Sequence, residues 1–129
     1  MSYTVQGEIL GFANTKKVSL QEIDQLFYTL KDEENEHISF TLVNPYLLRE
    51  YSFDVPQETQ KLLDIKEDSQ VSVYNILVIQ KPLEDSVINF LAPLIINHDN
   101  NTITQIILDP KDHPDFGIAE PIKSFKSDT

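Results

Sequence analysis

The sequence contains no cysteine and only three glycines among its 129 residues. The absence of cysteine excludes disulfides, thiol nucleophiles, thiolate zinc sites and iron–sulfur clusters. With glycine only at positions 7, 11 and 117, neither of the phosphate-binding motifs GxxxxGK[ST] and GxGxxG can be written. Thiol chemistry, thiolate-bound metals and these two types of nucleotide site are therefore excluded.

Positive charge is also scarce. Lys and Arg together number 10, whereas Asp and Glu number 21, so the formal net charge is −11 and the sequence pI is about 4.5. Arginine occurs once, at Arg49. Contact with phosphate groups or anionic lipids requires a cationic surface, so we expect neither direct nucleic-acid binding nor membrane binding.

Long apolar runs are missing as well. The longest run, Phe90–Ile96, is far shorter than the roughly 20 residues that span a bilayer. The N-terminus shows no basic region followed by an apolar region, so we predict no secretory signal and a cytoplasmic protein. The length suits a single domain, with a core at about residues 3–117 and a tail at about 118–129.

The patterns that are present belong mainly to β-strands. The turn sequence His98–Asn101 separates two apolar segments and is typical of a tight hairpin. Pro93 cannot donate to a strand ladder, so we expect it at a sheet edge or a bulge. Alternation of apolar and polar residues, or apolar character on both faces, predicts strands at Tyr3–Gln6, Ile38–Asn44, Arg49–Val55, Val71–Ile79, Leu94–Asn97 and Thr102–Leu108.

Helical signals are few. Residues Gln57–Leu63 are good helix formers, with Asp54 as the expected cap and Pro56 in the first turn. Residues Ser19–Leu30 are ambiguous: a capping-box pattern and apolar spacing favour a helix, although part of the segment alternates. Seven to nine strands with one or two short helices predict a mainly β fold, a small antiparallel barrel or sandwich.

Catalytic patterns are not apparent. Asp109, Asp112, His113 and Asp115 form the densest titratable cluster, which is compatible with an oxygen-rich metal site but is more typical of a proline-punctuated surface loop. The three histidines have no Ser or Asp at a diagnostic offset, and paired carboxylates carry little information among 21 acids. We therefore expect no enzyme activity, no metal and no cofactor.

The strongest local charge feature is an acidic run that contains Asp32, Glu33, Glu34 and Glu36. Such a run is usually the solvated tip of a hairpin. It can also form part of a negative surface that steers a basic protein partner toward the molecule.

Several segments, in their order and spacing, resemble the FliW family of flagellar assembly factors. The stretch Asn89–Asn97, which reads Asn-x-Leu-Ala-Pro followed by apolar residues and Asn, is the most specific of them. The other matching segments are Gly7–Phe12, Ile38–Tyr46, Tyr51–Pro56, Val73–Val78 and Gln105–Asp109.

The resemblance implies a small β-barrel-like fold, with two short strands instead of a helix in Ser19–Leu30. It also implies binding of the RNA-binding translational repressor CsrA, which relieves repression of flagellin mRNA, and chaperone-like binding of flagellin. Two alternatives stay open: an unrelated acidic interaction module or nucleic-acid mimic, and a small enzyme or carbohydrate-binding barrel. By the family signature, the expected partner-binding residues are Asn44, Pro45, Asn89, Ala92, Pro93 and Asn97.

Overall fold

The computed structural model of the chain describes residues 1–12 and 14–125. It is mainly β, with one short α-helix in these residues, which confirms the predicted fold class. The helical elements are η1 Pro45–Leu47, α1 Gln57–Leu62, η2 Leu83–Asp85 and η3 Ile122–Phe125. The strands are β1 Ser2–Val5, β2 Lys17–Glu22, β3 Phe27–Asp32, β4 Ser39–Val43, β5 Val71–Val78, β6 Val87–Ile88, β7 Leu94–Asn97, β8 Thr102–Gln105 and β9 Glu120–Pro121.

Seven of the strands close into a barrel. Their order is β4-β3-β2-β1-β8-β7-β5, and β5 pairs again with β4. Strand β5 closes the ring because Val71–Tyr74 pair with β7, whereas Asn75–Leu77 pair with β4. All these pairings are antiparallel except β1 with β8, which is parallel. The end of β5 also pairs with β6, and β6 with β9.

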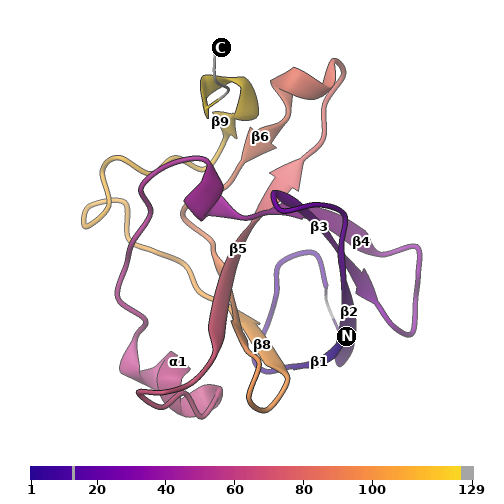
Figure 1. Cartoon of the computed structure of the whole chain (residues 1–129), viewed down its shortest axis with the longest axis vertical. Coiled ribbons are helices and arrows are strands. Elements are labelled where there is room, and N and C mark those ends of the chain that lie inside the picture. The colour runs from indigo at the N-terminus through magenta and orange to yellow at the C-terminus, as the bar shows by residue number, and fades with distance from the viewer. Residues whose placement is uncertain (13, 126–129) are drawn as a thin grey trace.

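These extra strands lie at one end of the barrel and α1 at the other. Figure 1 shows β6 and β9 projecting at the top of the view, with α1 at the opposite end. In the part of the chain that the structure describes, no helix has the length and apolar character to cross a membrane.

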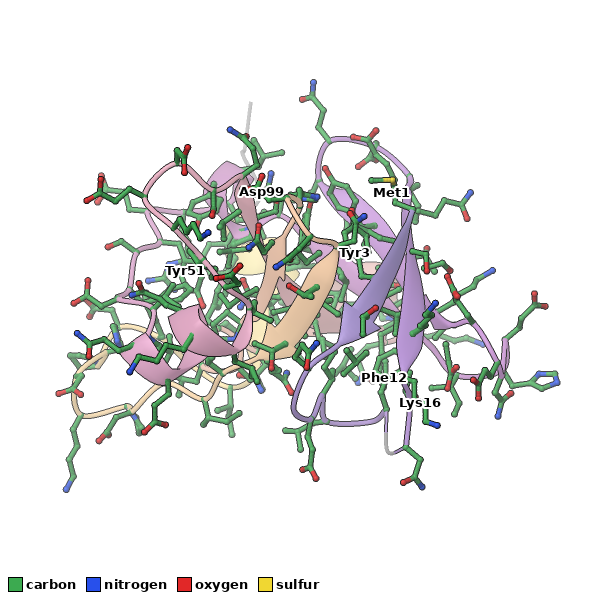
Figure 2. All side chains as sticks on the ribbon, turned by 90° about the horizontal axis from the view of Figure 1, so that it is seen from below. Met1, Tyr3, Phe12, Lys16, Tyr51 and Asp99 are labelled. Carbon is green, nitrogen blue, oxygen red and sulfur yellow. The ribbon has the colours of Figure 1, made fainter. Side chains whose placement is uncertain are left out.

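The protein has two apolar clusters because several strands bury both of their faces. Along β7, Leu94 and Ile96 join one cluster, and Ile95 joins the other. This arrangement explains why the segment before His98 is apolar at successive positions instead of alternating. In Figure 2, Tyr51 lies on one side of the pale orange strands and Tyr3 on the other.

The first cluster fills the barrel. All seven barrel strands contribute to it, through Tyr3, Val18, Leu30, Leu42, Tyr74, Leu94, Ile96 and Ile103. The second cluster lies against β4, β5, β6 and β7 and takes its other buried residues from connecting segments, among them Tyr51, Leu63, Phe90 and Leu108. Burying each large side chain in these clusters contributes roughly 1.5–3 kcal/mol to folding.

The helix favoured by the pattern in Ser19–Leu30 is wrong; the segment forms β2 and β3, as the family resemblance implies. Ile23, one of the residues that gave the helical spacing, is 59% exposed in the turn between the strands. Asp24 stabilises that turn, since its Oδ1 accepts hydrogen bonds from the backbone N–H groups of Leu26 and Phe27, each at 2.8 Å. Pairing with β1 and β4 therefore overrides the local helical signal.

The strand expected at Arg49–Val55 is also wrong. Burial does alternate there, with Tyr51 buried between exposed neighbours, but the segment is irregular and crosses the second cluster without entering a ladder. Asp54 does not cap the helix: Pro56 occupies the cap position, and no side chain makes a capping hydrogen bond. Helix α1 itself confirms the prediction for Gln57–Leu63.

Pro93 lies at neither a sheet edge nor a bulge. It immediately precedes β7, and its carbonyl accepts a hydrogen bond from Ile106 N–H at 3.1 Å. Pro93 cannot donate the reciprocal bond, so the ladder between β7 and β8 ends at Leu94 and Gln105. The turn His98–Asn101 joins β7 to β8 as predicted, and Asn101 adopts a positive φ of 56°.

Part of the expected tail belongs to the folded unit. Residues 120–125 form β9 and η3, and Phe125 packs against the second cluster. The remainder of that tail, residues 126–129, lies outside the described residues.

Candidate functional site

The acidic run at the β3–β4 connection contains two kinds of residue. Asp32 is only 6% exposed, and its carboxylate accepts hydrogen bonds from the Thr15 hydroxyl at 2.7 Å and from Glu34 N–H at 2.9 Å. The Thr15 hydroxyl, followed by the Glu34 amide, lowers the pKa of Asp32. Glu33, Glu34 and Glu36 are exposed. The surface charge of this loop therefore comes from the three glutamates, and Asp32 fixes the start of the loop.

The signature pair Asn44 and Pro45 begins η1. The Asn44 Oδ1 accepts a hydrogen bond from Tyr46 N–H at 3.1 Å, and the ring of Pro45 is buried. An asparagine cap followed by proline is a standard way to start a helical turn. These two residues therefore position the exposed Tyr46 and Leu47.

The signature residues around position 90 make internal contacts. Asn89 Oδ1 accepts from Leu91 N–H at 3.0 Å, and the Asn89 carbonyl accepts from Asn75 Nδ2, also at 3.0 Å. Ala92 is 4% exposed, and its carbonyl accepts from Gln105 Nε2 at 3.0 Å. Pro93 is buried beside it. This stretch is tied to β5 and β8 through these side-chain hydrogen bonds.

Asn97, the last signature residue, is fully buried and links the β7–β8 hairpin to the helix. Its Nδ2 donates to the Leu63 carbonyl at 2.9 Å, and its Oδ1 accepts from Asp99 N–H at 3.0 Å. Asn100 Nδ2 donates to the same Leu63 carbonyl at 2.8 Å. Four of the six signature residues, Pro45, Ala92, Pro93 and Asn97, are thus buried. Their contacts explain their place in the fold, and a direct role in partner binding stays a prediction.

The cluster after the last barrel strand lies beside a polar hollow. Asp109, Asp112 and His113 line the hollow together with Asp54, and its volume is about 650 Å³. Asp109 Oδ1 accepts a hydrogen bond from Lys111 N–H at 2.9 Å, as in a surface turn. Within the described residues, no three His, Asp or Glu side chains come together in a way that would hold a metal ion.

A second candidate for binding is an apolar groove at the end of the barrel where β6 and β9 project. Its volume is about 590 Å³, which is within the range of ligand and peptide sites. Two of its side chains are strongly exposed, Leu47 at 55% and Leu83 at 62%. The apolar groove is lined by Leu26, Phe27, Leu47, Leu48, Leu77, Pro82, Leu83, Glu84, Ile122, Lys123 and Phe125.

Sequence reasoning missed this groove because its walls come from five separate segments: the start of β3, η1, β5, the η2 turn and η3. Because these segments are far apart in the chain, no short sequence motif contains residues from all of them. The only local signal is Leu83, a single apolar residue in the polar stretch Lys81–Asp85. An exposed leucine alone is unremarkable, and only its neighbours in space give it significance.

Negative charge lies beside the groove. Glu84 is part of its wall, and Asp24 binds the backbone of Leu26 and Phe27, two other wall residues. The cation in the wall, Lys123, is paired with Asp85 at 2.8 Å. The groove thus combines an apolar floor with acidic residues nearby, a combination suited to an apolar segment that carries flanking positive charges.

The chain has clear relatives. The family model described as FliW protein matches residues 2–122. The protein is 49% identical over 125 residues to flagellar assembly factor FliW 1 of Wolinella succinogenes, covering 97% of this chain and 98% of that relative. It is 46% identical over 125 residues to flagellar assembly factor FliW of Sulfurimonas denitrificans, with 97% and 98% covered. A crystal structure of the flagellar assembly factor FliW has the same fold, with a TM-score of 0.85 at 23% identity over 99% of this chain and 88% of that one.

Proposed function

This chain belongs to the FliW family of flagellar assembly factors, and we propose that it acts in the cytoplasm by binding two proteins, without enzyme activity. The first is the translational repressor CsrA, whose repression of flagellin mRNA it relieves. The second is flagellin, which it holds in the manner of a chaperone. Family membership removes the alternative of an unrelated interaction module.

The apolar groove is the observation that supports flagellin binding. A filament subunit that has not yet assembled exposes the apolar surfaces through which it will contact its neighbours. Exposed apolar side chains such as Leu47 and Leu83 provide a complementary surface that would cover such a segment. The groove is large enough for several side chains of one partner segment.

The acidic surface is the feature that supports CsrA binding. An RNA-binding repressor presents a cationic surface, because it must contact phosphate groups. The net charge of −11 and the exposed Glu33, Glu34 and Glu36 favour association with such a surface. The two partners would therefore depend mainly on different physical forces, apolar burial for flagellin and electrostatic attraction for CsrA.

Replacing Leu83 with aspartate tests the assignment of flagellin to the groove. The side chain is 62% exposed, so the substitution leaves the two apolar clusters intact. We expect Leu83→Asp to weaken flagellin binding at least tenfold, equal to about 1.4 kcal/mol, while CsrA binding changes little. Isothermal titration calorimetry with each purified partner measures both effects.

The matched control is Leu10→Asp, because Leu10 is 63% exposed and lies outside the groove. The two variants introduce the same charge and remove the same side chain. Equal effects of Leu83→Asp and Leu10→Asp on flagellin affinity would contradict the assignment to the groove. Failure of the unmodified protein to bind flagellin at all would contradict the proposed function itself.

A further inference from the structure

The only arginine of the sequence occupies an aromatic cage next to the apolar groove. The side chain of Arg49 is 19% exposed. Its guanidinium carbon lies 5.0 Å from the ring centres of both Phe90 and Phe116, and 5.7 Å from that of Phe125. At such distances a guanidinium is attracted to the faces of aromatic rings, and more strongly where water is partly excluded. Arg49 is therefore held by packing as well as by charge.

Arg49 also donates hydrogen bonds toward the C-terminal part of the chain. Its Nη1 donates to both carboxylate oxygens of Glu120, at 3.1 and 3.3 Å, and its Nη2 donates to the Asp115 carbonyl at 3.2 Å. The Nε donates to the Glu50 carbonyl at 3.3 Å. The planar guanidinium can serve these acceptors together, which an ammonium group cannot do.

These contacts join the two sides of the groove. Leu47 and Leu48, which immediately precede Arg49, form one wall, and Ile122 and Phe125, which follow Glu120, form part of another. Among the described residues, every side-chain hydrogen bond between residues 44–53 and residues 115–125 comes from Arg49.

Apart from the bonds to Arg49, the hydrogen bonds that attach residues 120–125 to other segments lie on the other side of the groove. Glu120 and Pro121 pair with β6, and Ile122 N–H donates to the Ser86 carbonyl at 2.8 Å. The Lys123–Asp85 pair connects the same two segments on the surface. These bonds fix η3 relative to η2, whereas the polar link to the segment after η1 comes from Arg49, beside the packing of Tyr51 against Phe116.

We infer that Arg49 is the positioning residue of the apolar groove: it sets the separation of the η1 wall from the η3 wall and so determines which partner segment fits. This inference rests on the proposed function, because flagellin is the occupant assigned to the groove. Arg49 is largely covered by aromatic rings and does not itself need to touch flagellin.

Hydrogen exchange of the free, full-length protein tests the positioning role without any partner. In Arg49→Gln, we expect backbone amides of residues 116–125 to exchange at least about tenfold faster, while amides of β1, β2 and β8 inside the barrel keep their rates. Arg49→Lys keeps the charge but loses the planar fork and the ring stacking. Its exchange rates should therefore lie between those of the unmodified protein and those of Arg49→Gln.

The control for charge is Lys123→Gln. It removes one cation from the same wall, but the Lys123 and Asp85 side chains are 57% and 43% exposed, so this ion pair should contribute little to order. We expect exchange rates in residues 116–125 within about threefold of the unmodified protein. Equal acceleration in Lys123→Gln and Arg49→Gln would overturn the inference, as would a uniform increase across the barrel in Arg49→Gln.

Flagellin affinity then tests the consequence for binding. Arg49→Gln should weaken flagellin binding at least about fivefold, and its CsrA affinity should stay within about twofold of that of the unmodified protein. Faster exchange in the η3 wall with unchanged flagellin affinity would overturn the role of Arg49 in selecting the partner. If the unmodified protein does not bind flagellin, the proposed function fails, and the exchange experiment still decides whether Arg49 holds the walls.

Discussion

At the scale of single residues, the connecting segments are held by a few buried polar side chains. Asn75 is fully buried on β5, and its Nδ2 donates to the Tyr51 hydroxyl at 3.2 Å as well as to the Asn89 carbonyl. The Tyr51 hydroxyl in turn donates to the Phe90 carbonyl. Tyr51 also contacts the rings of Phe90 and Phe116, with centroids 5.6 and 4.7 Å apart. Tyr51, which lies outside the strand ladders, thus connects the segments that contain Asn75, Phe90 and Phe116.

Replacing Tyr51 with phenylalanine isolates the contribution of its hydroxyl. The ring and its packing stay, but the buried Phe90 carbonyl loses its hydrogen-bond donor. We expect the free energy of unfolding at neutral pH to fall by about 1–3 kcal/mol. Urea unfolding followed by circular dichroism measures the change.

The pH dependence of this variant provides a second measurement. Burial raises the pKa of Tyr51 from 10.0 to about 12. The unfolded chain therefore ionises at this residue before the folded protein does, and stability is lost as the pH rises from 10 toward 12. Tyr51→Phe lacks this loss, so the difference in the free energy of unfolding between the variant and the unmodified protein should shrink as the pH rises from 10 toward 12. A deficit that is constant from neutral pH to pH 12 would contradict the burial of an un-ionised hydroxyl.

At the scale of elements, one connection between strands concentrates exposed negative charge that is available to a partner. The β3–β4 connection presents Glu33, Glu34 and Glu36, whereas Asp32 is turned into internal hydrogen bonds. Charges of this kind change the rate of association more than the affinity, because they act over a Debye length before contact.

We expect association with CsrA to slow as salt rises, and the triple variant Glu33→Gln/Glu34→Gln/Glu36→Gln to reduce this salt dependence. At low salt the loss in association rate should be modest, less than about tenfold. Flagellin binding should respond less, because we expect it to depend on apolar contact. Stopped-flow measurements at low and high salt determine both rates.

The matched variant is Glu58→Gln/Glu67→Gln/Asp68→Asn, which removes the same charge from exposed residues in and after α1. If both triple variants lower the rate equally, the net charge steers CsrA and the β3–β4 loop has no special part. An association rate that does not depend on salt would contradict electrostatic steering altogether.

At the scale of the whole molecule, the barrel carries a large excess of negative charge. The formal charge is −11, and the cation in the aromatic cage, Arg49, is paired with Glu120. The protein would therefore repel nucleic acid over most of its surface.

We predict that the purified protein alone does not change the electrophoretic mobility of flagellin mRNA near about 150 mM salt. CsrA serves as the positive control, and the protein added to the CsrA–RNA mixture should restore free RNA if the proposed function is correct. A mobility shift produced by this protein without CsrA would contradict the prediction and would require a cationic surface that its charges do not provide.

The sequence by itself determined the properties that depend on composition and on neighbouring residues. The absence of cysteine, the acidic charge and the turn His98–Asn101 are read directly, and local alternation located β4 and most of β5. Local spacing did not distinguish a helix from β2 and β3, nor a ladder strand from the irregular segment at Arg49–Val55. In both cases the outcome depends on whether a pairing partner lies alongside.

Only the tertiary structure decided which residues are functional candidates. It buried Asp32 and Asn97 in hydrogen bonds and assembled the apolar groove from segments that are far apart in the sequence. It also placed Arg49 among three phenylalanines. A residue's own chemistry and near neighbours set its local preference, whereas burial, pairing and the shape of a surface depend on long-range contacts that form only when the barrel closes.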